Sequence, residues 1–196
     1  MNVFILSLIA KYKYLGIFLS IILEQIIPFK INNYTCYISG ILLSLNSFSL
    51  ICTLLSLFIG SVIGSICIYI IGYFFSDFLN INYLKFGIKK IKEYFNSYPF
   101  LLTFIYKNTL LLKIIFPFLI GSLKISFKKF IIYNILNSFI NVCLFTYLGY
   151  FLQENFNLVN IFVLFINIFL LFLIYLFHKR KIKTLNIKSI KYKSKC

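Results

Sequence analysis

The sequence has little negative charge. Four Asp and Glu residues stand against 20 Lys and Arg residues, which gives a formal net charge of +16. The chain also has no tryptophan, a single histidine (His178) and a single arginine (Arg180). Its five cysteines form no CxxC pair, and metal sites need clustered Cys and His residues. So few acids and one histidine also leave no nucleophile–base set. We therefore expect a protein that is not an enzyme and that holds neither a metal ion nor a cofactor.

Apolar residues are what the sequence has in excess. Hydrophobic residues make up 61% of the 196 residues and charged residues only 12%, whereas a soluble domain is nearer to half apolar and about a quarter charged. This balance predicts an all-helical polytopic membrane protein. In such a protein a basic excess marks cytoplasmic flanks and contacts with anionic lipids. We therefore expect membrane lipids as partners, and no nucleic acid.

Charge-free runs divide the chain. Uncharged stretches extend over 31–76 and 130–153, and the first is too long for a single membrane-spanning helix. We predict full spans at about 47–75 and 130–153, an amphipathic surface helix at 78–97, and about three to four full spans in all. The predicted organisation is an interfacial N-terminal helix (1–13), a membrane domain (14–153), a C-terminal transmembrane helix (154–178) and a basic cytoplasmic tail (179–196).

The topology follows from the positions of the lysines. The tail, Lys128 with Lys129, and the surface at 85–92 are rich in lysine, and such segments stay on the cytoplasmic side. The segment 98–126 then begins and ends on one side, so we predict that it is a re-entrant hairpin. By the same count, the polar stretch 29–46 enters from the opposite side. The predicted fold class is therefore an all-α membrane protein with two opposed re-entrant hairpins.

An internal repeat agrees with this topology. Gly40 and Gly121 each close a hairpin and are followed by a turn containing Ser and Phe and then by a span. The two spans also end alike, in IIGYFF and YLGYFL. Similar halves of opposite orientation form the inverted repeat of many secondary transporters, whose site lies where discontinuous helices meet near the membrane midplane.

The stretch 107–121, KNTLLLKIIFPFLIG, is unusual because it places two lysines in an apolar setting. A lysine at membrane depth is costly unless it is paired or faces water. Glu24 is the one acid at predicted membrane depth, so we expect it to pair with Lys107 or Lys113. As a functional residue Lys113 is favoured over Lys107, because Lys107 can extend its ammonium group to the cytoplasmic surface.

Prolines and glycines are expected to shape this site. Pro28 and Pro117 are predicted to break helices at the two hairpins, and Gly40 and Gly121 to occupy turns. Along the first long span, glycines recur at spacings that permit close contact between helices; they are Gly60, Gly64 and Gly72.

Four stretches give the chain a likeness to one family. They are LEQIIPFKINNYTCYISG (23–40), GSVIGSICIYIIGYFFS (60–76), KNTLLLKIIFPFLIG (107–121) and KKFIIYNILNSFINVCLFTYLGYFL (128–152). Over residues 14–153 the chain resembles the DedA family, which carries the VTT or SNARE-associated domain. The resemblance covers most of the chain and includes the proline and the closing glycine of both hairpins.

The chain also departs from the family pattern. Asn33 stands where the first hairpin of the family usually has a second acid, and Ser65 stands where an acid follows the Gly-rich turn. Two lysines replace the family's arginines, and Leu110 replaces a proline between them. The residues that the resemblance implies for a substrate or proton site are Glu24, Asn33, Ser65, Lys107 and Lys113.

Members of the family look like transporters of phospholipids or polyprenyl phosphate carriers that depend on the proton motive force, with eukaryotic relatives that scramble lipids. The resemblance therefore implies a transporter or flippase for a lipid with an anionic headgroup, in a bacterial cytoplasmic membrane, with the C-terminus in the cytoplasm. Protons are a candidate coupling ion, and a homo-oligomer is left open. The alternative is a non-transporting membrane assembly or envelope-integrity factor with a degenerate site, which the neutral residues Asn33 and Ser65 favour.

Overall fold

The computed structural model describes residues 2–27, 33–77, 92–109 and 111–152, and every element within them is helical. The elements in chain order are α1 (Asn2–Tyr12), α2 (Tyr14–Ile26), α3 (Tyr34–Ser44), α4 (Leu50–Phe74), the short 3₁₀ helix η1 (Phe75–Asp77), α6 (Pro99–Asn108), α7 (Leu112–Ser122) and α8 (Phe127–Leu152). The predicted helix at 154–178 and the tail lie outside the described residues. Of the predicted surface helix, only 92–97 is described, and it is helical.

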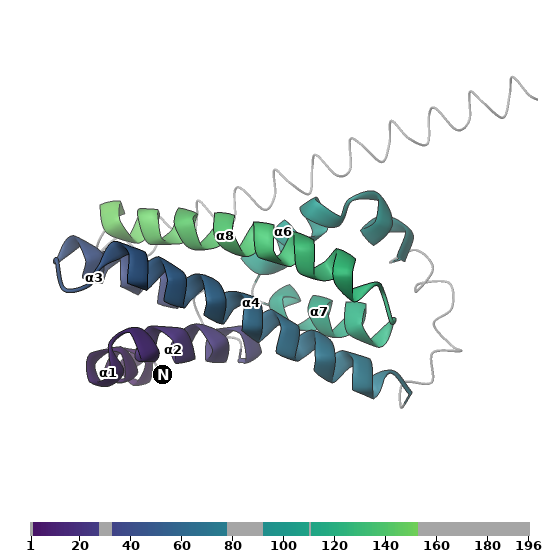
Figure 1. Cartoon of the computed structure of the whole chain (residues 1–196), viewed down its shortest axis with the longest axis horizontal. Helices are drawn as coiled ribbons and strands as arrows, with labels where there is room; N and C mark the ends of the chain where they lie inside the picture. Colours follow the sequence, from purple (N-terminus) through teal and green to yellow (C-terminus); the bar gives the residue numbers. More distant parts are fainter. Residues whose placement is uncertain (1, 28–32, 78–91, 110, 153–196) are drawn as a thin grey trace, which may run out of the picture.

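Two long helices, α4 and α8, run along the molecule (Figure 1). Both are long and apolar enough to cross a membrane, in agreement with the spans predicted at 47–75 and 130–153. Their backbone polar groups bond within the helix, as a lipid environment requires. Figure 1 shows α1, α2 and α3 gathered toward one end of this pair and α7 toward the other.

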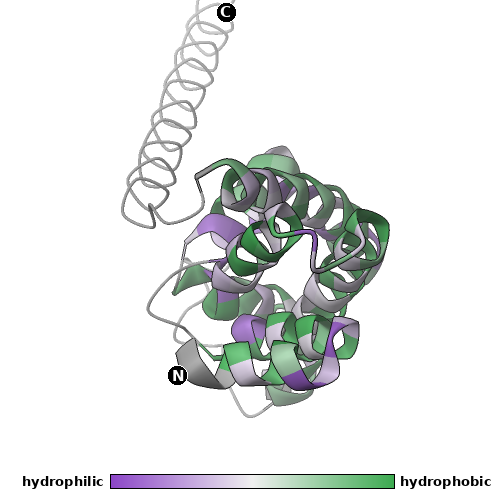
Figure 2. Cartoon of the chain, turned by 90° about the vertical axis from the view of Figure 1, so that its left-hand side faces the viewer, coloured by the Kyte–Doolittle hydropathy of each residue, from purple (hydrophilic) through white to green (hydrophobic). Residues whose placement is uncertain are grey.

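The distribution of side chains is that of a membrane protein. Large apolar residues such as Ile51, Phe74 and Phe151 are exposed on the outer faces of the long helices, and hydrophobic colour covers most of the ribbon in Figure 2. Charged and polar residues, by contrast, are among the most buried in the described chain. Exposed apolar surface of this extent is unfavourable in water but suits contact with lipid chains.

The short helices α3 and α7 each cross a long helix from the other half of the chain. A Cβ atom at Gly40 of α3 would overlap the carbonyl oxygen of Thr146, and one at Gly149 of α8 would overlap that of Tyr37. The second crossing, between α7 and α4, has the same form: a Cβ at Gly121 would overlap the carbonyl of Tyr69, and one at Gly72 that of Phe118. In every case the carbonyl belongs to the residue three positions before the facing glycine.

The turn interpretation of Gly40 and Gly121 is therefore wrong. Both lie inside helices, and no glycine in the described residues has a positive φ. What these positions need is the absence of a side chain, because two helix backbones approach each other there. The sequence pattern identified the glycines, but it did not separate helix contact from a tight turn.

Pro117 does not break a helix either. It lies inside α7, which continues to Ser122. Pro117 has no N–H to donate to the carbonyl oxygen of Lys113, so the first turn of α7 has one helical hydrogen bond fewer. Pro28 lies outside the described residues, but α2 ends as expected before a proline: Ile27 is extended, with φ −111° and ψ 124°.

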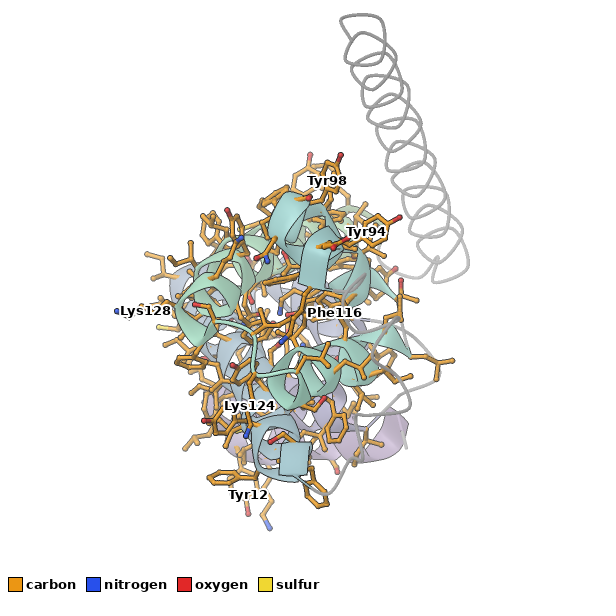
Figure 3. The ribbon with its side chains drawn as sticks, turned by 90° about the vertical axis from the view of Figure 1, so that its right-hand side faces the viewer. Tyr12, Tyr94, Tyr98, Phe116, Lys124 and Lys128 are labelled. Carbon is orange, nitrogen blue, oxygen red and sulfur yellow. The ribbon has the colours of Figure 1, made fainter. Side chains whose placement is uncertain are left out.

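Two hydrophobic clusters hold the helices together. One joins α1, α2, α3 and α8 around Ile17, Tyr37 and Phe145. The other is mainly aromatic and lies beside α6 and α7, where Phe116 stacks on Tyr106 with ring centroids 5.0 Å apart. Figure 3 views the molecule from this end and shows Phe116 in the interior, with Tyr94, Tyr98, Lys124 and Lys128 around it.

Candidate functional site

A buried ion pair joins the two halves of the chain. The Nζ atom of Lys113 lies 3.0 Å from Oε1 of Glu24, and both side chains are almost completely buried. Glu24 is near the end of α2, and Lys113 is in the first turn of α7. The predicted pairing of Glu24 with Lys107 or Lys113 is present in the structure, and the partner is Lys113.

The other oxygen of Glu24 anchors α3. The backbone N–H of Thr35, in the first turn of α3, donates to Oε2 of Glu24 over 2.9 Å. A carboxylate in this place satisfies a backbone donor that no helical carbonyl reaches, and it interacts favourably with the positive end of the helix. Glu24 thus replaces a conventional N-cap side chain, since Asn33, the residue before α3, makes no capping hydrogen bond.

The side chain of Asn33 makes no capping hydrogen bond because it contacts the ion pair between Glu24 and Lys113. Its Oδ1 atom accepts a hydrogen bond from Lys113 Nζ over 3.3 Å. Its backbone is left-handed, with φ 55° and ψ 30°, a conformation that Asn and Asp adopt more readily than most residues. Asn33 therefore has two roles: its backbone forms the bend before α3, and its side-chain amide accepts a hydrogen bond from the ammonium group of Lys113.

Lys107 donates hydrogen bonds to the neutral side chains of two serines, whereas Lys113 is paired with the carboxylate of Glu24. Its Nζ atom donates to the hydroxyl of Ser65 over 3.2 Å and to that of Ser61 over 3.3 Å, and the Nε2 atom of Gln25 also lies within 3.4 Å of Ser61 Oγ. The side chain of Lys107 is 2% exposed. The alternative, that Lys107 extends its ammonium group to the cytoplasmic surface, does not agree with this burial.

The break between α6 and α7 brings the two lysines to one place. Lys107 is in the last turn of α6, where the negative end of the helix favours a cation. Thr109 is extended, with φ −113° and ψ 124°, and α7 starts at Leu112. Lys113 is then at the positive end of α7, which disfavours an ammonium group, and the carboxylate of Glu24 offsets this.

All five residues predicted for the site thus belong to one buried centre. Glu24 and Asn33 surround Lys113, while Ser65 contacts Lys107. Sequence reasoning did not single out Ser61, Gln25 or Thr35. Ser61 was detectable in principle, because it lies one helical turn before Ser65 and so shares its face of α4. Thr35 acts through its backbone N–H, which no sequence motif encodes.

A helical bundle with an apolar exterior and a charged interior defines a membrane protein with a polar site between its helices. The comparisons give the family. Residues 38–151 match the model of the VTT domain, so the chain belongs to the VTT domain family and is a membrane protein of the DedA type. The match begins within α3, extends into the last turn of α8, and leaves Glu24 and Asn33 outside it. Neither the curated proteins nor the solved structures gave a match.

Proposed function

We propose that this protein transports or flips a membrane lipid that has an anionic headgroup. The observation that carries the proposal is the convergence of Lys107 and Lys113 on one buried centre, from the two helices of the α6–α7 hairpin. Ionisable groups inside a membrane protein are expensive, and they commonly mark the path of a substrate or ion. The lipid would be a phospholipid or a polyprenyl phosphate.

The charges of the centre suit such a headgroup. Two ammonium groups and the carboxylate of Glu24 leave an excess of one positive charge among the described residues of the centre. A phosphate diester carries one negative charge and would balance it. Lysine binds phosphate as a point charge with three donors, without the bidentate geometry of arginine. The use of lysine therefore supports a site that recognises the charge of the headgroup more than its exact shape.

The two lysines have different roles in the proposal. Lys107 donates to serine hydroxyls, which phosphate oxygens replace without separating an ion pair. Lys107 is therefore the first contact of the headgroup. Lys113 is held by Glu24, and a proton added to Glu24 would remove the charge that holds it. Proton binding at Glu24 would thus release Lys113 to the headgroup, which links lipid movement to protons.

Reconstitution in liposomes tests the proposal. The purified protein is reconstituted with a fluorescent phospholipid or a fluorescent polyprenyl phosphate, with and without a proton gradient. We expect movement of at least one anionic lipid, and we expect Lys107→Gln to abolish it. Lys128→Gln is the matched control, because Lys128 is exposed at the start of α8. Equal rates for Lys107→Gln and the wild type would overturn the assignment of the site.

The second candidate function is a non-transporting assembly or envelope-integrity factor. Its support is that the lysines contact neutral partners, Asn33 and Ser65, at the two positions where the family pattern has acids. A site with fewer acids has fewer groups to carry protons. Failure of the reconstituted protein to move either lipid, with or without a gradient, would favour this function.

We also propose that the chain forms an inverted repeat of re-entrant hairpins in a bacterial cytoplasmic membrane, with its C-terminus inside. The identical register of the α3–α8 and α4–α7 glycine contacts supports the repeat, and the positive-inside rule supports the orientation. Labelling of single cysteines with an impermeant reagent in intact cells tests it. Modification of residue 196 from outside the cell would contradict the orientation.

A further inference from the structure

The crossing of α6 and α8 is lined by amide and hydroxyl groups. Three asparagines on one face of α8 contact α6: Asn134 accepts from the Tyr106 hydroxyl over 2.8 Å, Asn137 donates to Thr103, and Asn141 donates to Asn108 Oδ1 over 2.9 Å. All three are at least nine-tenths buried. They extend over about 10 Å of α8 at 1.5 Å per residue.

The corresponding crossing in the first half of the chain, between α2 and α4, combines close packing at two glycines with a hydrogen bond from Gln25 to Ser61. Gly72 of α4 and Gly149 of α8 occupy equivalent positions in the two halves of the chain. The same difference in residue number makes Gly60 equivalent to Asn137 and Gly64 equivalent to Asn141. On α4 these positions pack closely on α2: a Cβ at Gly60 would overlap Ile21, and one at Gly64 would lie 2.7 Å from Gln25 Cγ. Equivalent positions therefore carry glycines in one half and asparagines in the other.

Two amide groups of the polar crossing are incompletely bonded. The Nδ2 atom of Asn134 and the Oδ1 atom of Asn137 are buried without a hydrogen-bond partner among the described residues. A buried donor or acceptor without a partner is destabilising. Such atoms point to a ligand or water that completes their hydrogen bonds. An unpaired donor and an unpaired acceptor on one face suit a group that, like hydrated phosphate, both donates and accepts.

We propose that the α6–α8 crossing is the path by which an anionic headgroup and its hydration water reach Lys107. This rests on the proposed lipid transport. The path ends at the site because Asn141 contacts Asn108, the neighbour of Lys107 in the chain. Its other end lies at Asn134, where Tyr106 stacks on Phe116.

A purely structural role explains less. Asparagines between membrane helices join them by hydrogen bonds, each of modest strength. That role predicts saturated amides, whereas two of the three side chains retain an unbonded atom. A purely structural role also does not explain why equivalent positions carry closely packed glycines in one half of the chain and asparagines in the other. A path that admits polar groups along the asparagines of α8 accounts for both observations.

Accessibility of introduced cysteines tests the path without relying on transport. In a background with all five native cysteines replaced by alanine, Asn134→Cys and Asn141→Cys are exposed to an anionic, membrane-impermeant methanethiosulfonate in proteoliposomes. Leu57→Cys is the matched control, because Leu57 corresponds to Asn134 by the same offset and is equally buried. We expect modification of the two asparagine positions to be at least about tenfold faster than that of Leu57→Cys, since thiol reactivity follows access.

Equal rates at all three positions would overturn the path. An Asn134→Cys variant that fails to fold is recognised by its loss of a cooperative thermal transition, and Asn141→Cys then decides the comparison. A transport measurement completes the test: Asn137→Leu keeps the size of the side chain and should lower lipid movement by about tenfold, the effect of losing roughly one strong polar contact. Unchanged movement in Asn137→Leu would also contradict the proposal.

Different results would contradict the proposed lipid transport and the proposed path. Fast modification of the asparagine positions in a protein that moves no lipid would contradict the proposed transport and support a polar path. Lipid movement that depends on Lys107, combined with slow modification at Asn134→Cys and Asn141→Cys, would support the transport and overturn this path.

Discussion

The ion pair between Glu24 and Lys113 gives the sharpest prediction about stability. We consider Glu24→Gln, Lys113→Met and the double variant. Glu24→Gln preserves the shape of the side chain and its capacity to accept the Thr35 N–H, which lies 2.9 Å away. It removes only the charge that faces Lys113 Nζ at 3.0 Å. Lys113→Met keeps the length of the lysine chain and removes the other charge.

The magnitude follows from the burial of both groups. The side chains of Lys113 and Glu24 are only 4% and 2% exposed, so neither charge recovers its hydration when the other is removed. Removal of one member of a buried pair costs about 3–5 kcal/mol, whereas replacement of both by neutral groups of similar volume is often neutral. A change of this size lowers the melting temperature of a chain of this length by roughly 6–20 °C.

The measurement is a double-mutant cycle on the purified protein in detergent, followed by thermal unfolding. We expect each single variant to melt well below the wild type and the double variant to melt above both single variants. Lys128→Met is the control, because surface substitutions usually change stability by no more than about 0.5 kcal/mol. Additive losses in the double variant would refute the reasoning, since independent effects add.

The same variants separate stability from function. The double variant is expected to regain much of its stability but to move no anionic lipid, because it has lost both the coupling acid and one cation. Recovery of transport together with stability would show that the pair acts only as a structural clamp. That result would leave Lys107 as the sole candidate for headgroup binding.

The remaining predictions concern packing and hydrogen bonding. Gly121→Ala should lower stability by about 1–3 kcal/mol, because its Cβ would overlap the carbonyl of Tyr69; thermal unfolding beside Cys52→Ala, a control at an exposed position of α4, measures this. Tyr106→Phe removes the 2.8 Å hydrogen bond to Asn134 and should destabilise the protein by about 1–3 kcal/mol, the effect of leaving a buried acceptor unbonded. Chemical denaturation of Tyr106→Phe measures that loss, and a wild-type midpoint would contradict the hydrogen bond.

The long helices were predictable because their signal is strong and local. An uncharged run of sufficient length must satisfy its own backbone in a membrane, and only a helix does so. The polar setting of the break between α6 and α7 was also predictable in outline, since the lysines on either side of it require one. The role of Pro117 was not predictable, because a proline inside a helix and a proline at a helix end look the same in the sequence. Only the packing around α7 decides between them.

The members of the site were more predictable than their geometry. Glu24 and Lys113 are 89 positions apart in the chain, yet each is an ionisable residue in an apolar stretch, which singles it out. Burial of Lys107 was one of two alternatives, because a lysine near a predicted surface also has an easy route to water. What keeps Lys107 inside is its hydrogen bonding to Ser61 and Ser65, and serine hydroxyl groups have no distinctive pattern in the sequence.

The replacements relative to the family pattern are matched in space. The resemblance to the family implies that lysines stand in place of two arginines and that neutral residues stand in place of two acids. In the structure Lys113 contacts Asn33, and Lys107 contacts Ser65. A guanidinium group has five donors to satisfy, whereas an ammonium group has three. A lysine therefore tolerates a weaker acceptor at the facing position than an arginine does.

Matched replacements argue that the centre is maintained as a unit. A site that had lost its role would accumulate apolar residues, because these pack more favourably than buried charges. Here both cations remain, and each has polar partners within hydrogen-bonding distance. The change removes acids but keeps the positive charge that an anionic headgroup needs. It leaves Glu24 as the single carboxylate of the described centre, so any coupling to protons depends on that residue.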